Sequence, residues 1–212
     1  MSDQRLLGYD LRCWPPPVWD AARRQRYLYR EDASQVLSVD PLAWPPPAQS
    51  EAVLEEHCGA GFLGLHEGPE ELAPLSNPDA VIIAVSVLAG AWSQAQRDTW
   101  DSLVLEPAGP GYASAGMRWL DEAPAPEGAH GLRFVGLDVA DSGLLSGLSS
   151  CGEVQTAAKG SYGKHLNQWH LFEDLGPAQA FCMFADTFVP EHAPFFVYGL
   201  WVCENPGASA ES

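Results

Sequence analysis

The chain has 212 residues, enough for one domain with an apolar core that needs neither disulfides nor metals. Hydrophobic residues make up 46% of it, which excludes general disorder. The formal net charge of -17 repels nucleic-acid phosphates and anionic lipid and attracts basic proteins, so we expect neither nucleic acid nor a membrane as partner.

The N-terminal third predicts one strand and two helices. Alternating apolar residues from Arg5 to Cys13 indicate a half-buried strand, which three prolines end. An apolar stripe then predicts a helix from Val18 to Arg30. The tetrapeptide that starts at Trp14, Trp-Pro-Pro-Pro, returns at Trp44 before a second predicted helix, Gln49 to Cys58. This pattern is consistent with a short duplicated strand, turn and helix unit.

The middle of the chain contains a run typical of a central strand. Val81 to Leu88 is β-branched and almost wholly apolar, which indicates a strand covered on both faces. A helix is predicted from Ala91 to Ser102. Residues 106–116 and 121–131 are rich in Gly, Pro and Ala and read as loops, the second being the best linker candidate. Leu132 to Val139 is predicted to resume a strand.

The last third completes the predicted fold. Pro177 to Phe188 has the single apolar stripe of an amphipathic helix, and Phe195 to Cys203 reads as a second strand buried on both sides. Strands and helices alternate too irregularly for a βαβ series. We therefore predict one α+β domain, 1–203, with a mixed, largely buried sheet flanked by helices. The two apolar strands should lie inside the sheet, the helix should pack on one face, and 204–212 should form a flexible tail.

The cysteines and the N-terminus bear on the compartment. Five cysteines is an odd number, and no CxxC pair occurs, so reduced thiols are expected rather than a disulfide framework or a zinc ribbon. The N-terminus has no apolar signal region, and the longest apolar run, Ala80 to Ala91, is too short to span a bilayer. We expect a cytoplasmic protein.

No catalytic signature is complete, although one thiol has histidines near it in sequence. Cys151 follows a Gly- and Ser-rich segment, and His165 or His170 could act as its base, because a thiolate is the reactive form of cysteine. P-loop, nucleophile-elbow and dinucleotide fingerprints are absent. A small cysteine-dependent hydrolase or transferase is therefore the alternative, and no cofactor is expected.

A divalent metal site is a further alternative, formed by His170, Glu173 and His192. Imidazole and carboxylate are suitable ligand types, but HExxH and HxxxH are absent. His165 and His170 are five residues apart, which on a helix directs them to different faces. A structural role for these histidines is favoured.

The charge distribution indicates a partner surface. Between Glu31 and Gln96 there is no Lys or Arg, while acidic residues accumulate. Tryptophans beside prolines could add aromatic anchors to such a surface. The predicted partner-binding residues are Glu51, Glu55, Glu56, Glu67, Glu70, Glu71, Trp14 and Trp44.

The N-terminus carries one resemblance. Gly8-Tyr9-Asp10-Leu11, followed by Trp14, resembles the YDL-x-x-W start of small uncharacterised bacterial proteins, some of them encoded as immunity partners of secreted toxins. The resemblance implies a cytosolic protein that binds and blocks one toxin, and an acidic surface would suit a basic nuclease or transferase. The leading hypothesis is thus a non-enzymatic, acidic binding protein of immunity or antitoxin type that engages a basic protein.

Overall fold

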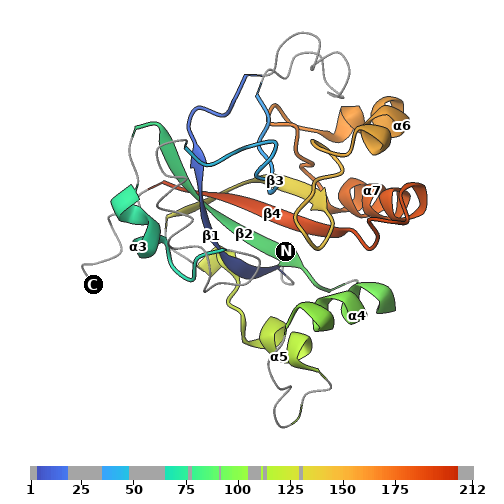
Figure 1. The fold of residues 1–212 in the computed structure, drawn as a ribbon, viewed down its shortest axis with the longest axis horizontal. Coiled ribbons are helices and arrows are strands. Elements are labelled where there is room, and N and C mark those ends of the chain that lie inside the picture. The colour runs from blue at the N-terminus through green and yellow to red at the C-terminus, as the bar shows by residue number, and fades with distance from the viewer. Residues whose placement is uncertain are drawn as a thin grey trace.

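We describe the protein from a computed structural model, in which residues 4–18, 35–47, 65–75, 78–90, 92–104, 111, 114–128 and 131–204 are described. Their centre is a four-stranded antiparallel sheet in the order β1-β2-β4-β3 (Figure 1). The strands are β1 (Gln4–Cys13), β2 (Ala80–Leu88), β3 (Leu132–Ala140) and β4 (Phe196–Cys203). The α-helices are α3 (Pro69–Leu72), α4 (Gln94–Leu103), α5 (Ala115–Glu122), α6 (Gly152–Tyr162) and α7 (Leu175–Phe188). Short 3-10 turns follow at Ala73–Leu75, Pro126–Gly128 and Gly163–His165.

The α+β fold class predicted from the sequence is confirmed. The two almost wholly apolar strands, β2 and β4, form the interior of the sheet as expected, with β1 and β3 at its edges. One detail differs, because all three pairings are antiparallel where a mixed sheet was expected. Each strand that joins the sheet runs opposite to its neighbour, so none of these pairings needs a parallel crossover.

The sheet is buried on both faces, which explains the apolar runs. Val85 and Tyr198 point into one core cluster, which also holds the tryptophans of the α4 region. Val197, next to Tyr198 in β4, enters a second cluster with Phe181 of α7. Because side chains alternate along a strand, apolar residues at successive positions are needed where both faces are covered. The predicted packing of the 177–188 helix on one face is confirmed, since α7 contacts β3 and β4 (Figure 1).

Three of the described helices, α3, α5 and α6, lie where the sequence did not predict them. Residues 106–116 and 121–131 were expected as loops, yet α5 begins at Ala115 and continues to Glu122. Its start is fixed by Ser114, whose Oγ accepts a hydrogen bond from the Met117 N–H at 3.2 Å and donates one to Asp101 at 2.6 Å. Helix α6 occupies the stretch after Cys151, where no element was expected.

Some expectations fall outside the described residues. The helix predicted from Val18 to Arg30 is one of them, since only Val18 is described. The others are the helix predicted from Gln49 to Cys58 and the tail beyond Glu204. Glu204, expected at the start of that flexible tail, is fixed. Its N–H donates to the Gly131 carbonyl at 2.8 Å, and its carboxylate pairs with Arg133.

Candidate functional site

A β-bulge in β1 positions the first acidic group. The register between β1 and β2 shifts between Leu6 and Gly8, and Gly8 has a φ of +156°. A Cβ at this position would lie 2.6 Å from the carbonyl oxygen of His66, so only glycine permits the close approach. The next residue, Tyr9, exchanges two backbone hydrogen bonds of 2.8 Å with His66. The bulge therefore docks the chain around His66 on the outer edge of β1.

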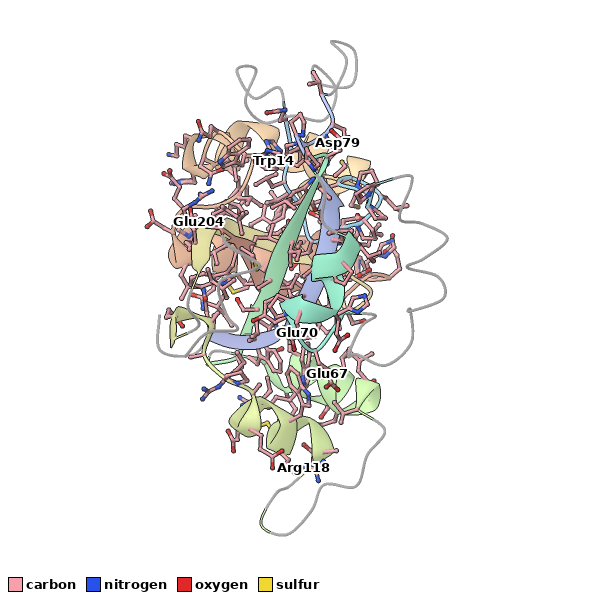
Figure 2. All side chains as sticks on the ribbon, turned by 90° about the vertical axis from the view of Figure 1, so that its left-hand side faces the viewer. Trp14, Glu67, Glu70, Asp79, Arg118 and Glu204 are labelled. Carbon is pink, nitrogen blue, oxygen red and sulfur yellow. The ribbon has the colours of Figure 1, made fainter. Side chains whose placement is uncertain are left out.

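The acidic segment, as we call Glu67, Glu70 and Glu71, follows directly from this docking point. All three side chains are exposed, and Leu72, fully buried against β1 and β2, anchors α3 beneath them. Glu71 lies 3.1 Å from the Nδ1 of His66. Figure 2 shows Glu67 and Glu70 on the side of the molecule where α3 lies. Glu51, Glu55 and Glu56, predicted for the same surface, lie outside the described residues.

The two tryptophans predicted for a partner surface have different environments. Trp14 is partly exposed, and its ring centroid is 6.1 Å from that of Trp169. The backbone N–H of Trp14 donates to the backbone carbonyl of Asp79 at 2.8 Å. Trp44 is fully buried and its indole Nε1–H donates to the Cys13 carbonyl at 2.8 Å. The prediction that Trp44 is available to a partner is wrong, because its side chain fills the core beside β1.

The structure does not bring Cys151, His165 and His170 together as a thiol site. Cys151 is the N-cap of α6, whereas His165 lies beyond the other end of this 11-residue helix, about 16 Å away along the axis. His170 is fully buried in a turn next to Asn167, which donates to the Val135 carbonyl in β3 at 2.8 Å. Cys151 and His165 therefore cannot act as nucleophile and base together, and the His170 side chain has no exposed surface to offer a substrate.

The alternative metal set is not brought together either. Within the described part of the chain, no group of three His, Cys, Asp or Glu side chains could hold a metal ion. Glu173 precedes α7 and His192 follows it, so the 14-residue helix lies between them. The Nδ1 of His192 instead lies 3.5 Å from a carboxylate oxygen of Asp141. The set of His170, Glu173 and His192 is thus wrong as a metal centre.

A buried carboxylate missed by the sequence analysis joins three segments. Asp138 of β3 accepts hydrogen bonds of 2.7 Å from the hydroxyls of Ser38 and Ser146, and of 3.0 Å and 2.8 Å from the N–H groups of Val39 and Val139. Burial raises its pKa to about 6, although these four hydrogen bonds act in the opposite direction. Because the network is wholly buried, it holds the fold together and offers no surface to a substrate. The only sequence signal was one acidic residue within an apolar strand.

The structure also contains a pocket that the sequence analysis missed. It lies between α4 and α7, beside the ends of β2 and β4, and has a volume of about 330 Å³. A signal was present in α7, where Gln179, Met183 and Asp186 recur at the spacing of one helical face. The lining residues are Leu88, Trp92, Ser93, Gln96, Gln179, Cys182, Met183, Asp186 and Val197.

Comparisons with protein-family models, with curated proteins and with solved structures found no match to this chain. Among the described helices, none combines the length and the apolar character needed to cross a membrane.

Proposed function

We propose that the protein is a non-enzymatic binding protein that engages a basic protein partner through the acidic segment, in the manner of an immunity or antitoxin protein. The observation that carries the proposal is the exposure of Glu67, Glu70 and Glu71 together, within a stretch, residues 31–96, that contains no Lys or Arg. A basic partner meets no repelling charge from that stretch. Of the predicted surface tryptophans, Trp14 is partly exposed and remains a candidate anchor.

Electrostatic complementarity determines what such a surface can do. Exposed ion pairs contribute little each, about 0–1 kcal/mol, so three carboxylates do not give tight binding by themselves. They do raise the association rate and disfavour acidic competitors, since the net charge of -17 adds a long-range field of the same sign. Affinity must then come from apolar contacts around the charged centre.

A thiol enzyme is the weaker candidate because its groups are dispersed. Cys151 and His165 lie at opposite ends of α6, and His170 is buried. If Cys151 resists alkylation at neutral pH while the protein is folded, the enzyme hypothesis fails, since a nucleophilic cysteine must form a thiolate readily.

The proposal is tested with the partner isolated from native cells. The tagged chain is recovered at low salt, the bound protein is identified and purified, and its Kd is measured between 50 and 500 mM NaCl. We expect a basic protein whose binding weakens steeply with salt. Replacing Glu67, Glu70 and Glu71 by Gln should weaken it at least about tenfold, equivalent to about 1.4 kcal/mol.

A matched control separates location from total charge. Asp98→Asn, Glu173→Gln and Glu191→Gln together also remove three exposed carboxylates, on α4 and at the two ends of α7. This control should retain the wild-type Kd. Equal weakening by both variants, or binding that is indifferent to salt, would contradict the proposed role of the acidic segment.

A further inference from the structure

The pocket between α4 and α7 goes beyond the proposed function, because it lies on the other side of the molecule from α3 (Figure 1). Its walls are mainly apolar, formed by Leu88, Trp92, Met183 and Val197. A volume of about 330 Å³ is at the lower end of the range for ligand sites. The size therefore suits one long side chain better than a large cofactor.

Most polar groups of the pocket already have partners. Gln96 accepts from the Ser93 N–H at 2.8 Å and donates to the Phe195 carbonyl at 2.7 Å. The thiol of Cys182 donates to the same carbonyl at 3.1 Å. Burial, and then the charge of Asp186, raise the pKa of Cys182 to about 12, so the sulfur stays protonated. The pocket thus has the character of a binding site and not of a thiol nucleophile.

Asp186 is the one charged residue among the described residues that line the pocket. Its Oδ1 accepts from the Phe195 N–H at 2.6 Å, which fixes the carboxylate in place. Among the residues that the structure describes, no Lys or Arg lines the pocket and none forms an ion pair with Asp186. Burial raises its pKa, although the hydrogen bond from Phe195 opposes this, so the negative charge would gain from a cation beside it.

The rim of the pocket includes an exposed apolar side chain. Met183, which lines the pocket, has 66% of its surface exposed. Methionine is a flexible apolar contact residue that is common on surfaces that bind polypeptides. An aromatic wall such as Trp92 also favours a guanidinium group, which is planar and weakly hydrated.

From these observations we propose that the pocket binds an arginine side chain of a partner polypeptide. The apolar stem would lie along Leu88, Met183 and Val197, and the guanidinium would pair with Asp186. A single carboxylate on an apolar wall matches a ligand that is apolar along its length and cationic at its tip.

The test uses blocked peptides and the full chain labelled with ¹⁵N. One peptide is acetyl-Ala-Leu-Arg-Leu-Ala-amide, and the second carries citrulline, which has nearly the shape of arginine without its charge, in place of Arg. We expect the arginine peptide to shift the Trp92 indole and Gln96 amide signals and to bind at least about tenfold more tightly than the citrulline peptide. Equal affinities would overturn the proposal.

Variants of the full chain make the test specific to the pocket. Asp186→Asn retains an oxygen that can accept from Phe195 N–H, so the fold should persist while the preference for arginine is lost. Met183→Lys places a cation at an exposed rim position and should weaken arginine binding more than Met183→Gln does, because the Gln variant changes the same contact without adding a charge. An unchanged preference in both Asp186→Asn and Met183→Lys would overturn the assignment.

Two further binding measurements test whether the ligand is part of a polypeptide and whether it binds at this pocket or at the acidic segment. Acetyl-arginine-amide should bind more weakly than the peptide, and equal affinity would contradict a polypeptide partner. The variant with Gln at Glu67, Glu70 and Glu71 should retain the full preference for arginine. Loss of that preference would place the binding at the acidic segment and overturn the inference, while the proposed function would stand.

Discussion

Asp138 shows how one buried residue determines the position of distant segments. Its two oxygens accept four hydrogen bonds, from Ser38 and Val39 on one side and from Ser146 and Val139 on the other. A carboxylate has enough lone pairs to accept all four, and it has no donor when ionised. The residues after Ser38 and those around Ser146 are therefore joined through the end of β3.

The raised pKa of Asp138 predicts a specific dependence of stability on pH. The value changes from 3.8 in the unfolded chain to about 6, so the folded state binds this proton more tightly. Its contribution to stability is fully present below about pH 4 and is lost as the pH rises through about 6, by up to about 3 kcal/mol.

Asp138→Asn isolates this contribution. The variant cannot titrate at this position, and one backbone N–H then faces an amide NH₂, which costs about 1–3 kcal/mol. Urea unfolding of both proteins between pH 4 and 7 should show the stability advantage of the wild type shrinking as the pH rises. A constant difference across this range would contradict the assigned pKa.

The two Trp-Pro-Pro-Pro motifs show what local sequence leaves undetermined for a residue. Both tryptophans were predicted to be surface anchors, yet Trp14 is partly exposed and Trp44 is fully buried. The difference arises from a long-range contact, the hydrogen bond from Trp44 to the Cys13 carbonyl. No pattern within four residues encodes that contact.

At the scale of elements, the sequence predicted those parts whose pattern is strong. β2 and β4 are continuous apolar runs, and α7 has a clear apolar stripe, so all three were found. Helix α5 was missed because its eight residues lie in a Gly- and Pro-rich region and depend on the cap at Ser114. Helix α6 contains Gly152 and Gly160, and glycine is a poor helix former.

Two glycine substitutions, one in the β1 bulge and one in α6, should have opposite effects on stability. A Cβ at Gly8 would meet the His66 carbonyl oxygen at 2.6 Å and Leu65 at 2.8 Å, whereas a Cβ at Gly160 in α6 meets nothing within 4 Å. Gly8→Ala should therefore destabilise the protein and displace the acidic segment. Gly160→Ala should stabilise it by about 0.5–1 kcal/mol, since alanine is the better helix former.

Hydrogen exchange is the measurement that separates these two outcomes. In the Gly8→Ala variant the amides of Tyr9 and His66, which pair across the bulge, should exchange faster than in the wild type. They should be unchanged in Gly160→Ala. Wild-type protection in both variants would show that the acidic segment does not depend on the bulge.

For the whole molecule, the excess of 28 acidic over 11 basic residues predicts stabilisation by salt. A charge of -17 repels itself in the folded state, and the Debye length falls to about 10 Å at 0.1 M ionic strength. Thermal unfolding at pH 7.5 should shift upward by a few degrees between 10 and 300 mM NaCl.

The variant with Gln at Glu67, Glu70 and Glu71 provides the comparison for this salt effect. It retains a formal charge of -14, because three of the 17 excess negative charges are removed. Its unfolding temperature at low salt should be higher than that of the wild type, and its rise with salt should be smaller. A wild-type protein whose unfolding temperature is indifferent to NaCl would contradict the role assigned to self-repulsion.

The candidate site was predictable only in part. The acidic stretch is visible in the sequence because it depends on charge alone. The pocket was not visible, because it combines Trp92 and Gln96 of the α4 region with Cys182 and Asp186 of α7, almost 90 residues later in the chain. Convergence of this kind depends on the strand order, which the amino-acid pattern does not encode.

The covered borders of the sheet limit how another protein can attach. His66 bonds to Tyr9 on the β1 side, and Phe172 bonds to Leu137 on the β3 side. Main-chain groups that are already occupied cannot template an incoming strand, which is a common route both to peptide capture and to fibrous aggregation. A binding partner must therefore recognise this protein by its side chains. At high protein concentration, copies should not associate by strand pairing along these two edges.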